Sequence, residues 1–398
     1  MKNIAIIGGG MSGLVAAITA SNNKDNRITI YERQKDIGSK ILITGNGKCN
    51  ICNKRVAEGG HYTSSELDRL EELSRGFDSD KLITFFEELG LCLKEKDGYY
   101  YPVSNQAKSV YQVLQNAVKK AGIKVITDKY IDKIDKDGDG YKIDGGHYDA
   151  VVLACGGRAG VYKENAFSGR ELIKGLELKS SRTFPALTGA ICKGDYTLLK
   201  GVRIDASVKM IADGRFIKED AGEVQFADYG LSGIPIFNLS SHVPYDYKEL
   251  YFEVDIFPQT SEEDLSVKLD NIKARYPKYR IINALSGYTN MGILGYILKE
   301  VGISEDELME NISKGKLHKI SAYSKKSIHN MERLRDYKNA QIMAGGILLS
   351  EIDNNYMCKH HKNLYITGEA LDLNGECGGY NLYFAFESGR AAGLTLGK

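Results

Sequence analysis

The first thirty residues alternate between short apolar runs and one glycine-rich turn. Residues 4–7 are an uninterrupted apolar run, of the kind that is buried on both faces of a parallel sheet. A helical pattern of apolar residues begins at Leu14, and residues 28–31 form a second strand-like run. This order predicts a strand, a tight turn, a helix and a second strand. We therefore expect an α/β fold with a Rossmann-like domain at the start of the chain.

The turn between the first strand and the helix has the spacing GxGxxG, made by Gly8, Gly10 and Gly13. Gly8 permits the sharp turn, Gly10 lets a pyrophosphate approach the backbone, and Gly13 lets helix and strand pack closely. Glu32 ends the second strand, 19 residues after Gly13, where a carboxylate that binds a ribose is expected. The sequence therefore predicts a dinucleotide site with its phosphates on the N-terminal amides of the helix.

The middle of the chain has a different pattern. Period-two alternation predicts half-exposed antiparallel strands over residues 202–210, 215–218 and 249–254. After Pro258, apolar residues have helical spacing over residues 261–276, 292–299 and 304–312. The first and the third of these segments begin with a serine followed by acidic residues, which is typical of a capped helix N-terminus. We therefore expect a small β unit followed by a helical unit.

The C-terminal part returns to the pattern of the first domain. Residues 363–372 predict a strand that ends in Gly368 and Glu369, and the glycines at 378 and 379 precede a further helix. The N-terminus of that helix would suit the electron-rich pyrimidine side of a reduced flavin. Because only one GxGxxG turn is present, NAD(P) has no domain of its own, and FAD is the expected dinucleotide.

Composition narrows the class of protein. A chain of 398 residues suggests two or three domains, and 53 Lys and Arg against 52 Asp and Glu do not favour a nucleic-acid binder. Seven scattered Cys, no secretory signal and no long apolar run favour a soluble cytoplasmic protein without a membrane span. The seven His show no ligand spacing, so we expect no metal. A small molecule is the expected partner, and the oligomeric state is left open.

Five motifs together resemble the NAD(P)/FAD-dependent flavoprotein family that includes bile-acid dienone reductases and L-aminoacetone oxidase. They are residues 8–13, 40–50, 228–233, 345–347 and 368–382. The resemblance implies an FAD-binding domain built from both chain ends, residues 1–188 and 336–398. Between them it implies an inserted β-barrel-like subdomain, residues 189–258, and an inserted helical subdomain, residues 259–335.

Cofactor contacts are expected from the turn and from the resemblance. The turn and the second strand supply Gly8, Gly10, Met11, Ser12, Gly13, Glu32 and Arg33. By resemblance, the isoalloxazine and pyrophosphate are lined by Lys40, Thr44, Gly45, Asn46, Gly47, Cys49 and Asn50. Ile131 would offer a backbone amide to the adenine, and a strand end would approach the cofactor at Ala154, Gly156 and Gly157. The C-terminal motif adds Gly368, Glu369, Asp372, Gly378, Gly379, Tyr380, Asn381 and Leu382.

Four residues are candidates for catalysis: Asn46, Cys49, Tyr101 and Tyr380. A tyrosine phenol such as that of Tyr101 can protonate a developing enolate. Cys49 and Cys52 form a CxxC pair, which invites a redox-disulfide interpretation. We favour an accidental pair, because the family more often has a hydroxyl residue at the position of Cys52.

The expected activity is reduction of a conjugated C=C, such as that of a bile-acid or steroid-like enone, by reduced FAD. NAD(P)H would bind transiently and supply the electrons to the FAD. An alternative is an FAD-dependent amine oxidase of a small aminoketone that produces hydrogen peroxide, because an oxidase needs no nicotinamide domain. A third and lesser hypothesis is a flavin-bound redox sensor or binding protein, such as one associated with RNA.

Overall fold

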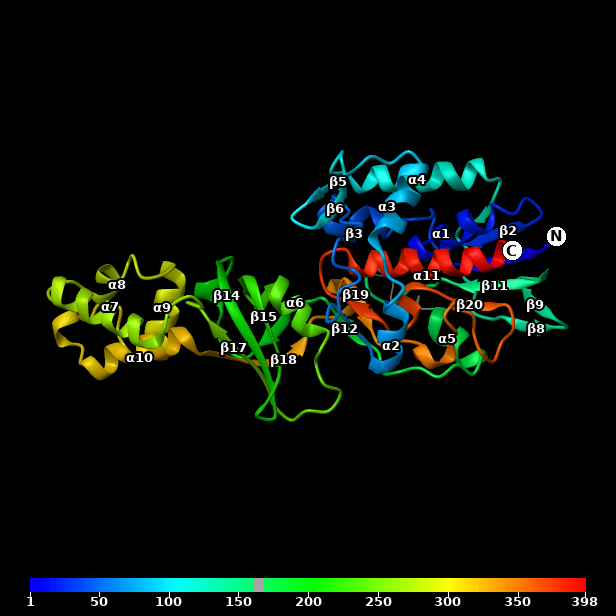
Figure 1. The fold of residues 1–398 in the computed structure, drawn as a ribbon. Helices are drawn as coiled ribbons and strands as arrows, with labels where there is room; N and C mark the ends of the chain where they lie inside the picture. Colours follow the sequence, from blue (N-terminus) through cyan, green and yellow to red (C-terminus); the bar gives the residue numbers. More distant parts are fainter. Residues whose placement is uncertain (161–167) are drawn as a thin grey trace. The chain divides into compact units, whose positions relative to one another are not determined.

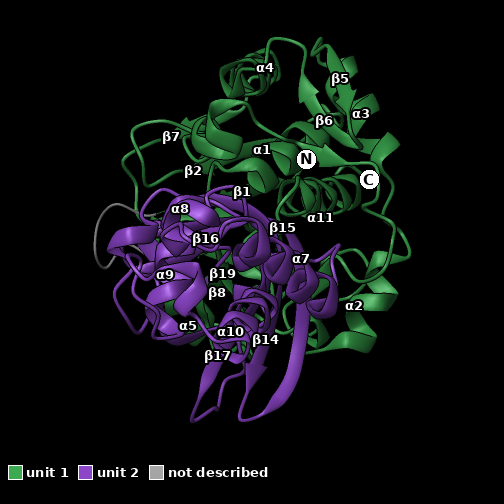
Figure 2. Cartoon of the chain, turned by 90° about the vertical axis from the view of Figure 1, so that its left-hand side faces the viewer, with its two compact units in different colours: residues 1–185, 341–398 green, residues 186–340 purple. Residues whose placement is uncertain are grey.

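The computed structural model describes residues 1–160 and 168–398. The chain divides into two compact units (Figure 2). Each unit has its own hydrophobic core. Unit 1 consists of residues 1–185 and 341–398, and unit 2 of residues 186–340. Unit 1 thus joins the two ends of the chain, and unit 2 is inserted between them in the sequence.

A five-stranded parallel sheet organises unit 1 (Figure 1). Its order is β20-β11-β1-β2-β7, with the bounds Leu364–Ile366, Ala150–Leu153, Asn3–Ile7, Arg27–Tyr31 and Lys124–Ile126. In the central strand β1, Ile6 is fully buried and pairs with Ile30 on one side and Val152 on the other. The predicted Rossmann-like α/β domain is confirmed.

Helix α1 (Met11–Ala20) packs against α11 (Tyr380–Leu396) and against α4 (Ala107–Lys120). The contact between α1 and α11 is close because α11 has glycines where the helices meet. A Cβ on Gly389 would lie 2.3 Å from the carbonyl oxygen of Ser12, and one on Gly393 would lie 2.7 Å from Cβ of Thr19. The two helices therefore run side by side in the same direction.

Shorter elements complete unit 1. A three-stranded meander, β8 (Asp135–Asp137), β9 (Gly140–Ile143) and β10 (Gly146–Tyr148), contacts β1 and β11. A second small sheet consists of β3 (Cys52–Asn53), β6 (Tyr99–Pro102) and β5 (Leu93–Lys96). Two short pairs are β4 (Tyr62–Thr63) with β21 (Asn374–Gly375), and β12 (Phe184–Ala186) with β19 (Ile342–Ala344). The remaining helices are η1 (Ile41–Gly47), α2 (Leu67–Ser74), α3 (Ser79–Glu88), α5 (Ser168–Gly175), η5 (Leu349–Glu351) and η6 (Gly368–Ala370).

Unit 2 contains a closed barrel in the order β13-β16-β15-β14-β17-β18. The bounds in that order are Ala190–Cys192, Gly230–Gly233, Arg215–Ala227, Arg203–Ala212, Leu250–Asp255 and Ser327–Leu334. The expected inserted barrel is thereby confirmed. Strand β18 lies within the range 259–335 that was expected to be helical, and its alternating burial places it in the barrel instead.

The helices of unit 2 are η2 (Thr197–Leu199), α6 (Ile234–Ser240), α7 (Glu262–Arg275), α8 (Ile281–Ala284), α9 (Met291–Glu300), η3 (Met309–Asn311), α10 (Lys314–Lys325) and η4 (Tyr337–Asn339). The helix predicted over 304–312 is wrong, since only η3 forms there. Backbone groups of this segment form hydrogen bonds with residues 279–281 instead of with one another. The amide of Met309 donates to the carbonyl of Tyr279, and the carbonyl of Glu307 accepts from the amide of Ile281.

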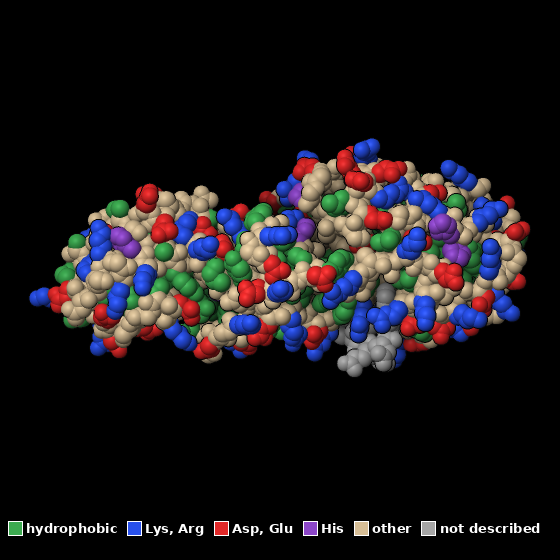
Figure 3. All heavy atoms as spheres, turned by 90° about the horizontal axis from the view of Figure 1, so that it is seen from below, with side chains coloured by type: hydrophobic (Ala, Val, Ile, Leu, Met, Phe, Trp, Pro, Cys, Tyr) green, Lys and Arg blue, Asp and Glu red, His purple; other side chains and the backbone are tan. Residues whose placement is uncertain are grey.

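The surface carries both charge types. On the face shown in Figure 3, Lys and Arg are interspersed with Asp and Glu, as the nearly equal totals of 53 and 52 suggest. Among the described residues, no helix has the length and apolar character needed to cross a membrane.

Candidate cofactor site

A pocket of about 200 Å³ opens in unit 1 at the carboxyl ends of β1, β2 and β11. Ligands of doubly wound sheets bind at this edge. Ten of the predicted residues line it together: Gly8, Gly10, Glu32, Arg33, Lys40, Ile131, Ala154, Gly156, Gly157 and Glu369. The pocket thus unites segments from both ends of the chain.

The three glycines of the first turn have different surroundings. A Cβ on Gly8 would lie 2.2 Å from the carbonyl oxygen of Ala154, and Gly8 has φ +112°. A Cβ on Gly13 would lie 2.0 Å from the carbonyl oxygen of Gly8. A Cβ on Gly10, by contrast, would meet nothing within 4 Å. Gly8 and Gly13 are thus required by packing, whereas Gly10 borders open space in which a phosphate fits.

Helix α1 begins directly at this space. Its N-cap, Gly10, has no side chain, so no side-chain cap satisfies the first amides of the helix. Met11, Ser12 and Gly13 are buried in the first turn, where their contribution to a ligand would be the backbone amides. The amides and the positive end of the helix dipole form a site suited to an anion.

Glu32 is held rigidly at the pocket. Its Oε2 accepts a hydrogen bond from the amide of Gly9, at 2.7 Å, and its Oε1 accepts one from the amide of Gln34, at 2.8 Å. An ionised carboxylate offers about four acceptor positions, so two remain for further donors. The hydroxyls of a ribose would fit this acceptor.

Arg33 supports the fit of an anionic cofactor. It lines the pocket, and its Nη1 is buried without a hydrogen-bond partner among the described residues. A buried guanidinium nitrogen without an acceptor is destabilising, and the phosphate or adenine acceptors of FAD would relieve this. Lys129 also lines the pocket, and its Nζ lies 2.5 Å from Oδ1 of Asp144.

Lys40 and Glu369 form an ion pair at the pocket, with 2.6 Å between Nζ and Oε2. The other carboxylate oxygen, Oε1, accepts a hydrogen bond from the amide of Met343 at 2.8 Å. A Cβ on Gly157 would lie 2.4 Å from that oxygen, so the glycine is needed for this close approach. Lys40 is 43% exposed in its side chain and can turn toward a phosphate.

Residues 44–50, the rest of the motif that contains Lys40, do not line this pocket. The segment leaves helical geometry at Thr44, Gly45 and Asn46, the last with φ +52°. Cys49 has φ +55° and is fully buried, and its amide donates to the carbonyl of Thr44. The cofactor roles of Thr44, Gly45, Asn46, Gly47, Cys49 and Asn50 stay predictions.

A second glycine turn precedes α11. Gly378 and Gly379 have φ +117° and +92°, and no side chain caps the helix. A Cβ on Gly378 would lie 2.7 Å from Cε1 of Tyr99, and one on Gly379 would lie 2.7 Å from the backbone of Cys52. The turn therefore packs against β3 and β6, and no side-chain cap of α11 is found among the described residues.

Other residues of the C-terminal motif serve the fold. Asp372 accepts hydrogen bonds from the amide, at 3.0 Å, and the hydroxyl of Ser65. Asn381 forms two hydrogen bonds with the backbone of Gly375, and the amide of Gly368 donates to the hydroxyl of Ser388. Leu382 packs against the core of unit 1. The cofactor contacts expected of Asp372, Asn381, Gly368 and Leu382 stay predictions.

The reactive groups proposed from sequence are mostly buried. Burial raises the pKa of the Cys49 thiol to about 11 and that of Cys52 to about 12, which disfavours the thiolate that redox chemistry needs. Burial also raises the pKa of Tyr380 to about 12. Tyr101 lies on β6, away from the pocket lining, and burial raises its pKa. Within the described part of the chain, no cluster of potential metal ligands is found.

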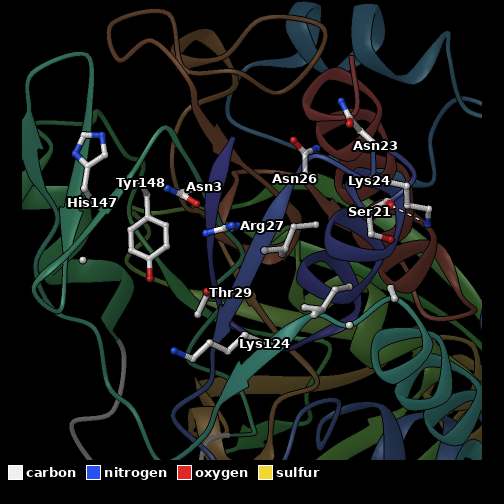
Figure 4. Close-up of a pocket in the computed structure, with 15 residues that line it drawn as sticks. Asn3, Ser21, Asn23, Lys24, Asn26, Arg27, Thr29, Lys124, His147 and Tyr148 are labelled. Carbon is white, nitrogen blue, oxygen red and sulfur yellow. Dashed lines mark hydrogen bonds between the residues drawn. The ribbon is translucent and has the colours of Figure 1, made fainter. Parts of the chain in front are cut away.

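A larger cavity of about 470 Å³ lies at the opposite, amino edge of the sheet (Figure 4). It borders Asn3, Arg27 and Lys124 at the strand starts, and Ser21 and Ala121 at the ends of α1 and α4. Helix C-termini carry partial negative charge and no free amides, so this edge does not suit a pyrophosphate. Its basic side chains offset the dipoles of the two helices.

Several lining residues were missed from sequence: Ile7, Gly9, Tyr31, Gln34, Asp36, Gly38, Ser39, Ile43, Lys129, Cys155, Ala159 and Gly160. Most are neighbours of predicted residues, so extending each motif by one or two positions would have found them. Lys129 lies two positions before the predicted Ile131 and would have been found in this way. It reaches the pocket because its amide bonds to the carbonyl of Glu32.

Comparisons with known proteins identify the family of the chain. The family model described as HI0933-like protein Rossmann domain matches residues 2–395. The 3-dehydro-bile acid delta(4,6)-reductase of Clostridium scindens is 32% identical, with 100% of both chains covered. The ribosomal RNA dihydrouridine synthase of Haemophilus influenzae is 22% identical, over 99% of this chain and 98% of that protein.

A solved structure shows the same fold. The 3-ketosteroid-delta4-(5alpha)-dehydrogenase from Rhodococcus jostii RHA1, in complex with 4-androstene-3,17-dione, superimposes with a TM-score of 0.51 at 14% identity. The match covers 100% of this chain and 97% of that one. The chain therefore belongs to the HI0933-like family of Rossmann-type flavoproteins and is an FAD-dependent oxidoreductase.

Proposed function

We propose that this enzyme uses NAD(P)H to reduce a carbon–carbon double bond conjugated to a carbonyl, in a bile-acid or steroid-like substrate. The observation that carries the proposal is the 32% identity, over the whole of both chains, to a protein named for reduction of a 3-dehydro-bile acid. A match of that length includes the inserted unit as well as the cofactor domain.

A second relative supports the same bond type. Dihydrouridine is uridine reduced at a C=C that is conjugated to a ring carbonyl, and the synthase from Haemophilus influenzae is named for that product. The two names therefore describe one chemistry, hydride addition to an activated alkene. We favour the steroid-like substrate over a nucleoside because identity is higher to the bile-acid reductase, 32% against 22%.

The residues of the pocket have separate roles in this proposal. FAD, when bound, supplies hydride transfer between a nicotinamide and an organic acceptor. The amides at the start of α1, with Arg33 and Lys40, would hold its phosphates, and Glu32 would accept from its ribose. The amides at the start of α11 would face the pyrimidine edge of the flavin.

The proposal is tested by anaerobic turnover. Purified holoenzyme is mixed with NADH or NADPH and with a 3-oxo-4,6-dienoic bile acid, and the product is identified by mass spectrometry. We expect nicotinamide consumption only when the dienone is present, and a product heavier by two hydrogens per double bond reduced. The saturated 3-oxo bile acid is the matched control and should not be consumed.

Three results would contradict the proposal. Nicotinamide consumption without any alkene acceptor would indicate a different acceptor. Oxidation of aminoacetone with release of hydrogen peroxide in air would indicate an amine oxidase. Reduction of uridine in RNA, with the bile acid unchanged, would indicate the activity named for the second relative.

A further inference from the structure

His61 and Glu376 form a paired acid group beside the second glycine turn. His61 Nδ1 and Glu376 Oε2 are 2.9 Å apart, and the side chains are 21% and 17% exposed. Because a carboxylate only accepts, Nδ1 carries the hydrogen and donates it. The backbone repeats the pairing, since the amide of Glu376 donates to the carbonyl of His61 at 2.9 Å. The pair is thus fixed at both main chain and side chain.

Neighbouring elements hold the imidazole in place. Strand pairing of Tyr62 with Gly375 sets the register on either side of the pair. The imidazole stacks on the ring of Tyr380, with 4.7 Å between centroids and 20° between planes. The other nitrogen, Nε2, lies 3.9 Å from Oε2 of the exposed Glu58. One edge of the ring is therefore held, and the edge with Nε2 is directed away from Glu376.

The position of Tyr380 relates the pair to the cofactor. Tyr380 is the first residue of α11, and Gly389, the tenth, touches Ser12, the second residue of α1. Both helices run in the same direction, so α11 begins about 12 Å beyond the start of α1 at 1.5 Å per residue. The phosphates of the cofactor belong at the start of α1. The pair therefore lies beyond them, on the side of α11.

We propose that His61 is the proton donor of the reduction and that Glu376 is its positioning residue. This inference rests on the proposed function. The hydride forms a C–H bond at the β-carbon of the enone while the C=C π bond breaks, and the proton on Nε2 of His61 forms a C–H bond at the α-carbon. NAD(P)H is oxidised, the alkene is reduced by two electrons, and water returns a proton to Nε2.

The geometry favours His61 over the other groups in this region. A histidine held through Nδ1 by a carboxylate can release the proton on Nε2 and remain hydrogen-bonded. The hydroxyl of Tyr380 is buried without a hydrogen-bond partner among the described residues, and the Cys49 side chain is fully buried. Both residues are buried from the solvent that would have to return the proton.

The test separates the two halves of the reaction in H61A, H61Q and a matched control. The control is H147A, because His147 Nδ1 also lies 2.9 Å from a carboxylate, that of Asp137, but at the opposite edge of the sheet (Figure 4). Each variant is reduced anaerobically with NAD(P)H and then mixed with the dienone. The dissociation constant of FAD and the unfolding temperature are measured in parallel.

We expect H61A and H61Q to have the wild-type affinity for FAD, the wild-type unfolding temperature and the wild-type rate of reduction by NAD(P)H. Their reoxidation by the dienone should be slower by about 100-fold or more, since a general acid contributes about 10²–10⁴-fold. Added imidazole should restore the rate in H61A, and the wild-type rate should fall in D₂O. H147A should behave as wild type throughout.

Reoxidation of both His61 variants at the wild-type rate would overturn the inference and leave the proposed function intact. Loss of FAD or of folding in H61Q as well as H61A would also overturn it, because the pair would then serve the structure. Failure of wild type to be reoxidised by any enone would instead reject the proposed function.

Discussion

Lys40 donates a hydrogen bond to Glu369 across 329 positions of sequence, with 2.6 Å between Nζ and Oε2. Both residues line the cofactor pocket, so the pocket exists only when the two ends of the chain have folded together. The pair is partly exposed, and such pairs contribute no more than about 1 kcal/mol to stability. Its significance is positional, because it places a cation next to the expected phosphates.

The glycines of the first turn allow a test that separates folding from cofactor binding. G10A should unfold like wild type without FAD, because its Cβ meets nothing within 4 Å, and yet bind FAD about tenfold more weakly, because the methyl group enters the phosphate space. G13A should be destabilised by about 2 kcal/mol or more, because its Cβ overlaps a backbone oxygen. Thermal unfolding and FAD titration measure the two effects. Equal effects of the two substitutions on unfolding would contradict the assignment of Gly10.

Arg33 should slightly destabilise the apoprotein and strengthen the binding of FAD. R33M removes a buried nitrogen that has no hydrogen-bond partner among the described residues, so the apoprotein should be as stable as wild type or more stable. FAD affinity should fall by about tenfold, because a charge-assisted hydrogen bond is lost. K35M, at a neighbouring exposed position, is the control and should change neither quantity. A cofactor affinity unchanged in R33M would remove Arg33 from the site.

The CxxC pair should be chemically inert. Burial raises the pKa of Cys49 to about 11 and of Cys52 to about 12, so both remain thiols at pH 8 and form thiolates only as the pH rises toward those values. Iodoacetamide at pH 8 should therefore modify the exposed Cys92 first, as peptide mapping by mass spectrometry would show. C52S should retain turnover. Loss of turnover in C52S with FAD still bound would instead indicate a redox role for the pair.

His329 should make the barrel of unit 2 sensitive to acid. It is fully buried, with Nδ1 2.7 Å from the hydroxyl of Tyr196 and Nε2 2.9 Å from that of Ser327. Burial lowers its pKa from 6.5 to about 4, so the unfolded chain takes up a proton between pH 6.5 and 4 that the folded chain does not. The contribution of neutral, buried His329 to the free energy of unfolding is therefore complete above pH 6.5. It is lost as the pH falls toward 4, by about 3 kcal/mol in total.

The measurement is the free energy of unfolding as a function of pH in wild type and H329Q. H329Q should be less stable at neutral pH and lose less stability between pH 6.5 and 4. A wild-type slope in H329Q would show that other groups cause the acid sensitivity.

The first turn was predictable because its determinants are local. Gly8, Gly13 and Glu32 lie within a single strand–turn–helix–strand unit, and the contact that requires Gly13, with the carbonyl oxygen of Gly8, lies inside that unit. The contact that requires Gly8 is with Ala154, outside the unit, although the spacing of the motif is local. The barrel strands were predictable for the same reason, since alternation over residues 202–210 reports burial on one face of β14. The helix expected over 304–312 failed because residues 279–281 take its hydrogen bonds, a partner that lies outside any local window.

The rest of the site depends on contacts between distant residues. Asp372 follows a strand and resembles a cofactor ligand by sequence. In the structure its carboxylate accepts a hydrogen bond from the amide of Ser65, 307 positions away. His61 was noticed only as one of seven His without metal spacing. Its partner Glu376 lies 315 positions away, so no pattern along the chain could connect them.

The most direct test of the account is anaerobic stopped-flow absorbance near 450 nm on the purified holoenzyme. We predict that NADH or NADPH bleaches the flavin band and that a 3-oxo-4,6-dienoic bile acid restores it in the absence of oxygen. Bleaching by aminoacetone, with recovery only when air is admitted, would contradict the account and establish an oxidase.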